Sequence, residues 1–285
     1  MKRGPLRLLA GALLLASCGG TRPDIATLAS NSDQVIWEAG QKAAEKKQWE
    51  TARQHFKRII EGFPQSQVGP QARLALADSY FQEGGTGNYI LAVSAYREFL
   101  TFFPTHARSD YAQFQVGESF WRQKNSPDRD QTATEEALAE FQRLLEQYPD
   151  SPKAEETRGR IRECRQSLAQ AEFLAGVFYQ RTRQSCRASI ARYEGILNDY
   201  PDYTGLDEVL FRLSQCLCQS GRGVEAQPHL AKLREEYPNS PLAADAKDFV
   251  CDTAVAPPPP TPSPAATPAV EASPLPSPTP TPPAP

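Results

Sequence analysis

The hydrophobic residues in the central part of the chain follow a helical pattern that recurs five times. Each copy ends with an aromatic residue and a proline: Phe63-Pro64, Phe103-Pro104, Tyr148-Pro149, Tyr200-Pro201 and Tyr237-Pro238. A small residue stands twelve positions before each proline, and large apolar residues stand eight, five and one positions before it. These intervals of four, three and four residues place all four side chains on one face of an α-helix. Because proline disfavours the α conformation of the residue before it, the pattern predicts five helices that end at these pairs.

A further helix is predicted before each of these five. It carries a small residue or Asp 24 to 32 positions before the proline: Gly40, Asp78, Gly117, Gly176 and Ser214. A small residue lets two helices approach closely, and stacked helix pairs bury the apolar stripe that a single helix leaves exposed. The two-helix pattern resembles the tetratricopeptide repeat. We therefore predict an all-α fold, a tetratricopeptide (TPR) α-solenoid of about five helix pairs over residues 33–250.

Two departures from the repeat indicate how the solenoid is organised. The glycine-rich stretch at residues 84–87 lengthens one turn, and it lacks the Lys-Ser/Thr that a phosphate-binding P-loop requires. Between Pro149 and Gly176 the chain has 14 more residues than between Pro104 and Gly117. These residues keep a helical stripe, so they predict about four extra turns in the first helix of the fourth pair. We expect that helix to join an N-terminal half, residues 33–149, to a C-terminal half, residues 150–250.

The N-terminus has the features of a secretory signal. Basic residues precede the apolar run at residues 8–16, which is too short to span a bilayer. The following Leu15-Ala16-Ser17-Cys18 resembles a bacterial lipobox, which implies a signal peptide at residues 1–17 and lipidation of Cys18. A cleaved signal peptide with a nearby cysteine is the alternative. No Asp follows Cys18, so we expect attachment to the outer membrane, facing the periplasm, with residues 18–32 as a tether.

The C-terminal end has a composition that does not support a folded core. Residues 257–285 hold 14 of the 26 prolines of the chain, and Glu271 is their only charged residue. Such a segment has little apolar surface to bury, so residues 251–285 are predicted to form a disordered Pro-rich tail. A spacer or a ligand for a proline-binding module is the functional alternative to a tail without a partner.

Composition argues against several classes of function. The formal net charge is −3, without a block of like charge, which argues against nucleic-acid binding. The three histidines are far apart, and the cysteines lack a C-x2-C spacing, so we expect no metal site. Motifs for nucleophilic, metal-dependent or nucleotide-dependent catalysis are missing, so the chain is predicted not to be an enzyme and to need no cofactor.

The cysteines after Cys18 are five in number, so at least one must stay a free thiol. A disulfide between Cys164 and Cys216, or between Cys218 and Cys251, could form across neighbouring helices. The alternative is that most of these residues, Cys186 included, are small buried hydrophobic side chains.

Several segments go beyond the positions that helix packing demands. They are Arg97-Glu98-Phe99-Leu100, Pro104-Thr105-His106, Asp110-Tyr111, Asp128-Arg129-Asp130, Leu168-Ala169 with Glu172 and Tyr179, and residues 192–201. Together they resemble the BamD family (also called ComL or YfiO), lipoproteins of the machinery that assembles outer-membrane β-barrels. The resemblance covers residues 33–248, and the Pro-rich tail and the cysteines are departures from it.

The resemblance implies a non-enzymatic scaffold. Its partners would be the periplasmic domains of the barrel-forming subunit BamA, unfolded outer-membrane β-barrel proteins as clients, and other Bam lipoproteins. It further implies that Arg192, with Glu194, contacts BamA from the C-terminal half. Tyr80, Tyr111 and Phe114 are candidate walls of a client groove in the N-terminal half. A solvent-facing position for Arg192 and core positions for the three aromatic residues are the alternatives.

Two rival functions share parts of this pattern. The first is another periplasmic TPR lipoprotein, such as a pilotin for pilus assembly or a factor in cell-envelope division. The second is a periplasmic enzyme that uses the repeats only for docking, which would need a further folded core outside residues 33–250.

Overall fold

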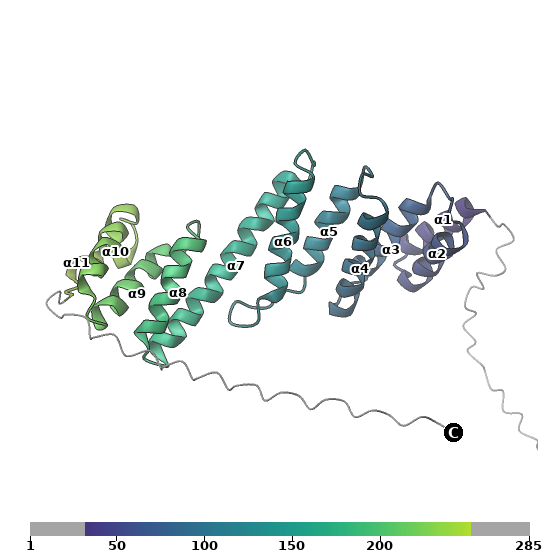
Figure 1. Ribbon diagram of the computed structural model, residues 1–285. Coiled ribbons are helices and arrows are strands. Elements are labelled where there is room, and N and C mark those ends of the chain that lie inside the picture. The colour runs from purple at the N-terminus through teal and green to yellow at the C-terminus, as the bar shows by residue number, and fades with distance from the viewer. Residues whose placement is uncertain (1–31, 252–285) are drawn as a thin grey trace, which may run out of the picture. The chain divides into compact units, whose positions relative to one another are not determined.

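The computed structural model describes residues 32–251, and this part of the chain is helical (Figure 1). The signal peptide, Cys18, most of the tether and residues 252–285 of the predicted tail lie outside the described residues. The helices are α1 (Asp33–Glu45), α2 (Trp49–Gly62), α3 (Gly69–Glu83), α4 (Thr86–Phe102), α5 (Ser109–Trp121), α6 (Thr132–Gln147), α7 (Ala154–Arg181), α8 (Cys186–Asp199), α9 (Leu206–Gln219), α10 (Gly223–Glu236) and α11 (Pro241–Asp248). None of these helices is long and apolar enough to cross a membrane.

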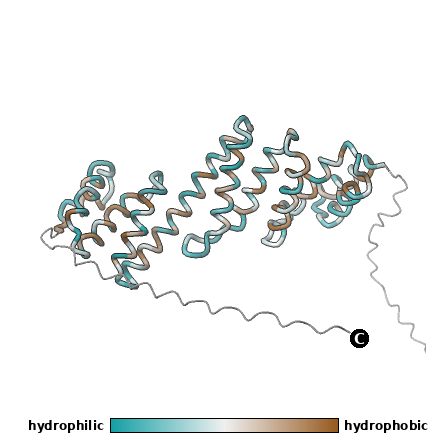
Figure 2. Tube along the Cα trace, viewed as in Figure 1, coloured by the Kyte–Doolittle hydropathy of each residue, from teal (hydrophilic) through white to brown (hydrophobic). Residues whose placement is uncertain are grey.

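The first ten helices form the five pairs that the repeat predicts, and the all-α TPR fold is confirmed. Helices α2, α4, α6, α8 and α10 each end directly before an aromatic–proline pair. Helix α11 is an additional element that follows the fifth pair. The predicted lengthening is also confirmed, because α7 has 28 residues whereas α5 has 13. Hydrophobic and hydrophilic positions alternate along the helices, as one-sided burial requires (Figure 2).

Small residues on the first helix of a pair accept an aromatic ring from the second. A Cβ added at Gly40 would lie 2.6 Å from Cε1 of Phe56, and one added at Gly117 would lie 2.6 Å from Cε1 of Phe141. At Gly176 the ring of Tyr193 is closer still. These positions therefore exclude any side chain, which confirms the reason for the small residue in the repeat.

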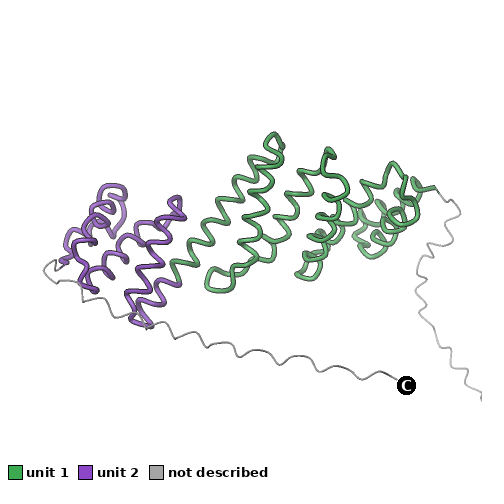
Figure 3. The backbone as a smooth tube through the Cα atoms, in the orientation of Figure 1, with its two compact units in different colours: residues 1–174 green, residues 175–285 purple. Residues whose placement is uncertain are grey.

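The chain divides into two compact units, residues 1–174 and residues 175–285 (Figure 3). The sequence placed the division at 149/150, in the loop before α7, but the structure places it inside that helix. The physical reason is that the first part of α7 contributes to the core of unit 1. Cys164 is fully buried in a cluster with Phe114, Phe141 and Leu144.

The structure decides between the two cysteine pairings. Cys218 on α9 forms a disulfide with Cys251, with a Cα–Cα distance of 5.5 Å. Cys251, which the sequence assigned to the tail, is therefore fixed to α9. Cys164 and Cys216 are free thiols. The pairing of Cys164 with Cys216 is thus wrong in this structure, since Cys164 lies in the core cluster of unit 1.

Candidate functional site

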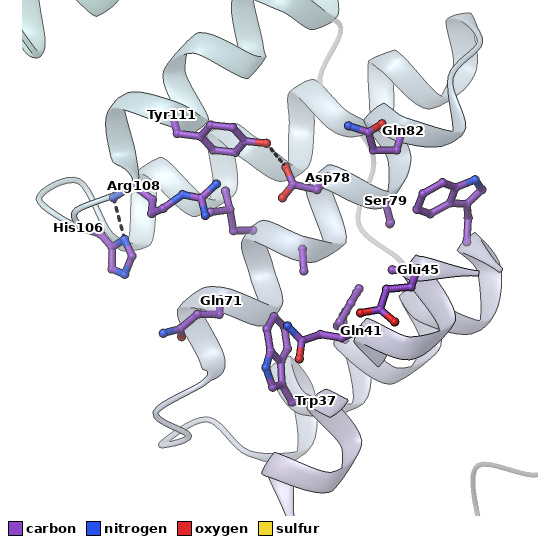
Figure 4. Close-up of a pocket in the computed structure, with 15 residues that line it drawn as sticks. Trp37, Gln41, Glu45, Gln71, Asp78, Ser79, Gln82, His106, Arg108 and Tyr111 are labelled. Atoms are coloured by element: carbon purple, nitrogen blue, oxygen red, sulfur yellow. Dashed lines mark hydrogen bonds between the residues drawn. The ribbon is translucent and has the colours of Figure 1, made fainter. Parts of the chain in front are cut away.

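Unit 1 contains a pocket of about 620 Å³ between the first helices of its three pairs (Figure 4). Helices α1 and α3 supply most of its lining, α2 and α5 contribute a few residues, and the loop before α5 closes one side. The lining residues are Trp37, Gln41, Ala44, Glu45, Trp49, Phe56, Gln71, Leu74, Ala75, Asp78, Ser79, Gln82, His106, Arg108 and Tyr111. The mixture of aromatic rings with a few side-chain amides and charges is typical of a site that binds a flexible organic or peptide ligand.

The apolar part of the pocket comes mainly from the first helix pair. The ring of Trp37 packs against Phe56, with centroids 5.5 Å apart. Phe56 is 1% exposed and anchored in the core, so Trp37 is held on a rigid base. Gln41, one turn further along α1, is exposed on the same wall. An aromatic ring beside an amide can bury an apolar side chain and hydrogen-bond the backbone of a bound segment.

Asp78 is the centre of the polar part of the pocket. Its Oδ1 accepts hydrogen bonds from the hydroxyl of Tyr96, at 2.6 Å, and from that of Tyr111, at 2.9 Å. Gln115 donates from Nε2 to the Tyr111 hydroxyl at 2.9 Å. Burial raises the pKa of Asp78 above its ordinary 3.8, although the two tyrosine hydroxyls and the charge of Arg108 oppose the rise. Burial and the Asp78 charge raise the pKa of Tyr111 to about 12, so its hydroxyl stays a donor.

Charged groups mark the rim of the pocket. The guanidinium of Arg108 lies over the ring of Tyr111, 4.2 Å from the ring centroid. The backbone N–H of Arg108 donates to Nδ1 of His106 at 3.1 Å, which holds the loop before α5. Glu45 at the end of α1 is exposed. The rim therefore presents charges of both signs around an interior of aromatic rings, side-chain amides and the hydrogen-bonded Asp78 carboxylate.

Within the described part of the chain, His, Cys, Asp and Glu side chains form no group of three or more that could hold a metal ion. The groups that line the pocket include aromatic rings, side-chain amides and a hydrogen-bonded carboxylate, which suit binding.

A second candidate surface lies on α8 in unit 2. Arg192 is exposed and Glu194 is half-buried. The hydrogen bond from Arg222 to Glu225 raises the pKa of Arg222, and burial opposes this rise. The charges of Glu225 and Glu194 add smaller increases. The Glu194 charge also counteracts the burial that lowers the pKa of His229. Glu194 therefore lies within electrostatic range of α10.

The family model of YfiO, described as an outer membrane lipoprotein, matches residues 29–222. That is more than half of the chain. The protein belongs to the YfiO (BamD) family. A tetratricopeptide-repeat model also matches residues 208–240.

Curated relatives of this YfiO-family chain carry one name, outer membrane protein assembly factor BamD. The protein of Caulobacter vibrioides is 24% identical over 225 residues, which cover 79% of this chain and 72% of the relative. That of Vibrio cholerae is 26% identical over 212 residues, covering 71% of this chain and 85% of the relative. A solved structure, the TPR2AB domain of yeast Sti1 in complex with pHSP90, aligns with a TM-score of 0.44 and 14% identity, covering 75% of this chain and 81% of that chain.

The family consists of non-enzymatic assembly factors, and the prediction that this YfiO-family chain is not an enzyme is confirmed.

The three predicted groove residues lie in different surroundings. Tyr111 lines the pocket. Tyr80 is half-buried on α3, where the guanidinium of Arg53 lies 4.8 Å from its ring centroid, and it is not among the lining residues. Phe114 is 4% exposed and packs against Phe141 at a centroid distance of 5.6 Å. The expectation that Phe114 forms a groove wall is therefore corrected, because α6 and α7 cover its ring.

Sequence reasoning missed the pocket residues on α1, above all Trp37 and Gln41. The signal was present, because both are placed by the repeat. Trp37 and Ala75 each stand three positions before the small-residue position of their helix, and Gln41 and Ser79 each follow it by one. These positions share one face of the first helix. Phe114 has the same register as Trp37, so a register rule alone would have chosen it too.

Proposed function

We propose that this chain is a scaffold lipoprotein of the outer-membrane β-barrel assembly (BAM) complex. It binds the periplasmic domains of BamA and unfolded outer-membrane β-barrel proteins, and it brings them together for insertion into the outer membrane. The observation that carries the proposal is the YfiO-family match over residues 29–222, which includes the helix pairs of the pocket and all of α8 and α9. The Caulobacter vibrioides relative, named as an outer membrane protein assembly factor, supports it over 79% of the chain.

The pocket of unit 1 supports the client-binding part of the proposal. An unfolded outer-membrane protein offers alternating aromatic and polar side chains and unpaired backbone groups. Trp37 and Tyr111 can bury apolar side chains, while Gln41 and Gln71 can pair with backbone groups. A wall of rigid helices places these groups at fixed spacing, which favours a segment of matching length.

Unit 2 carries the partner-binding part of the proposal. Arg192 on α8 is exposed and its planar guanidinium suits a carboxylate on a partner domain, with Glu194 as a neighbouring polar contact. Lipid on Cys18 would hold the chain at the outer membrane, facing the periplasm. Confinement to the membrane surface raises the effective concentration of the two partners and of other Bam lipoproteins.

Binding to the BamA periplasmic domains tests the partner arm. The lipid-free mature chain with Cys18→Ser is titrated with those domains by calorimetry, beside Arg192→Glu. The matched control is Arg187→Glu, an equally exposed arginine on α8. Binding that only Arg192→Glu weakens, by tenfold or more, supports both the role and the contact. Binding that neither substitution changes discards Arg192, and no binding by the unsubstituted chain favours another periplasmic TPR lipoprotein, such as a pilotin or a division factor.

Binding of a client segment tests the pocket. A fluorescent peptide from a β-strand of an outer-membrane protein is titrated with the chain and with Gln41→Lys, which places a long charged side chain in the pocket. Gln54→Lys on α2, exposed and outside this pocket, is the control. Weakened binding by Gln41→Lys alone supports the pocket. Equal binding by both variants would place the client elsewhere.

A further inference from the structure

Two free cysteines come together in unit 2 where α8 packs against α9. Cys186 is the first residue of α8, and Cys216 lies near the end of α9. The two helices pack against each other, so the start of α8 lies beside the end of α9. The Cys186 thiol donates to Oε1 of Gln219 at 3.0 Å, and Gln219 follows Cys216 by three residues on the same helix. The contact therefore fixes the Cys186 side chain next to the turn of α9 that carries Cys216.

The two thiols differ in their exposure to solvent. Cys186 is half-exposed, whereas Cys216 is fully buried. Burial and the neighbouring Cys186 thiol together raise the pKa of Cys216 to about 12. The contact of Cys186 with Gln219, three residues after Cys216 on α9, agrees with this interaction. An accessible thiol meets an oxidant first, and a second thiol beside it can then resolve the mixed disulfide.

The same end of α9 already carries a disulfide. Cys218 is two residues after Cys216, and it is joined to Cys251 after α11. A compartment that oxidises this pair also supplies the conditions for oxidising a second pair. The third free cysteine, Cys164, is buried in the core cluster of unit 1 with Phe114, Phe141 and Leu144.

We propose that Cys186 and Cys216 form a second disulfide, which fastens the start of α8 to the end of α9. With Cys218–Cys251, it attaches two segments to one end of α9: the start of α8 and the chain after α11. It also connects the oxidation state of this pair to the stability of α8, the helix that carries Arg192.

The chemistry balances with an external disulfide as oxidant, such as oxidised glutathione. Deprotonated Cys186 attacks one sulfur of that disulfide, forms a mixed disulfide and releases one thiolate, which takes up a proton. Cys216 then loses its proton to water and attacks Sγ of Cys186, which releases the second thiol. The two cysteines lose two electrons and two protons, and the external disulfide gains both and becomes two thiols.

Peptide mapping tests the proposal directly. The full mature chain is secreted to an oxidising compartment, treated with oxidised glutathione, alkylated without reduction and digested with trypsin. Cleavage after Arg and Lys yields residues 184–187 with Cys186, residues 213–222 with Cys216 and Cys218, and residues 248–285 with Cys251. The expected product is one species of three linked peptides that reduction separates. Cys164, on residues 163–165, should be alkylated.

Other products would overturn the proposal. One is a linked pair of residues 213–222 and 248–285 with alkylated residues 184–187. Another is a peptide with Cys164 linked to Cys216. Fragmentation at Leu217, between Cys216 and Cys218, shows which of these two cysteines is linked to Cys186. A product with Cys186 linked to Cys218 and Cys216 linked to Cys251 also contradicts the proposal.

Thermal unfolding gives a second readout that does not depend on digestion. Under oxidising conditions, Cys186→Ser should lower Tm by about 5 °C or more, because the unfolded chain loses a cross-link. Cys164→Ser is the control for a cysteine outside the pair: any loss from its buried site should be the same before and after glutathione treatment. If Cys186→Ser and the unsubstituted chain unfold at the same temperature after glutathione treatment, the second disulfide does not form.

Discussion

The second and third helix pairs of unit 1 are built on the same pattern but use one position differently. In pair three (α5 and α6), Gly117 has no side chain, and the ring of Phe141 occupies the space. In pair two (α3 and α4), the same position holds Asp78, and the ring facing it is Tyr96, whose hydroxyl donates to the carboxylate at 2.6 Å. Tyr96 and Phe141 are both fully buried. In pair three this position is thus filled by the packing of an apolar ring alone. In pair two it is filled by a carboxylate that is hydrogen-bonded to the facing ring and also lines the pocket.

The difference shows how a repeat protein places chemistry without disturbing its core. A carboxylate in the helix interface is costly unless it is hydrogen-bonded. Asp78 meets this requirement with two hydroxyl donors, Tyr96 from its own pair and Tyr111 from the next pair. The hydrogen bonds therefore join pair two to pair three while they orient Tyr111 at the pocket wall.

The largest effect is expected where pair three excludes a side chain. Gly117→Ala places a Cβ 2.6 Å from the ring of Phe141, which is fully buried and cannot move without repacking. We expect a loss of about 2 kcal/mol in the free energy of unfolding, measured by urea denaturation. Gly195→Ala on α8 is the matched control, because nothing lies within 4 Å of its added Cβ. It should gain up to about 1 kcal/mol from helix propensity, and equal losses in both variants would remove the packing argument.

The repeat predicts these packing positions well, but it does not predict the pocket. The aromatic–proline spacing placed Gly117 opposite Phe141 and Gly40 opposite Phe56, because both members of each contact belong to one helix pair. Whether a residue of the same register faces solvent or a neighbour depends on the next pair along the chain. Trp37 lines the pocket, whereas Phe114, at the equivalent position, is covered by α6 and α7. Part of that covering comes from α7, whose length could be predicted from the sequence but whose contacts could not.

A buried carboxylate that joins the two pairs should make unit 1 sensitive to acid. Glu140 on α6 is 2% exposed and accepts from Arg97 at 2.5 Å, Gln113 at 2.7 Å and Arg143 at 2.6 Å. Burial alone would raise its pKa. The hydrogen bonds from Arg97 and Gln113, with the charges of Arg143 and Arg97, outweigh it and hold the pKa below its ordinary 4.5.

The sign of the pH dependence follows from that lowered pKa. The unfolded chain binds the proton of Glu140 more tightly than the folded chain does. The stabilisation is therefore complete above pH 4.5 and is lost as the pH falls through the folded-state pKa. Glu140→Gln should cost roughly 1–2 kcal/mol at neutral pH and make the acid decline less steep. Parallel stability curves for Glu140→Gln and the unsubstituted chain, with exposed Glu135→Gln as control, would contradict this.

Pair two can be converted to the chemistry of pair three. Tyr96→Phe removes one donor to Asp78 and should cost about 1 kcal/mol. Combining it with Asp78→Gly also removes the carboxylate, so the double variant should be more stable than the sum of the single changes predicts, by about 1 kcal/mol. A double-mutant cycle in urea measures this coupling. Additive effects would show that the hydrogen bond between Tyr96 and Asp78 contributes little to the packing of pair two.

The smallest effect concerns the loops that follow the two pairs. After pair three, Ser151 donates from Oγ to Oδ2 of Asp110 at 2.5 Å and accepts from the N–H of Lys153 at 3.0 Å. After pair two, the equivalent position holds His106, which also accepts from a backbone N–H, that of Arg108 at 3.1 Å, but in addition lines the pocket.

Ser151→Ala should therefore cost roughly 0.5–1 kcal/mol in urea denaturation and leave client binding unchanged. His106→Ala should change client binding more than stability. Ser126→Ala, in an exposed turn where Oγ contacts Asp128, controls for loss of a hydroxyl and should change little. If Ser151→Ala and His106→Ala altered stability and binding in the same proportion, the two loops would not differ in role. The functional difference between pair two and pair three would then be limited to the position of Asp78.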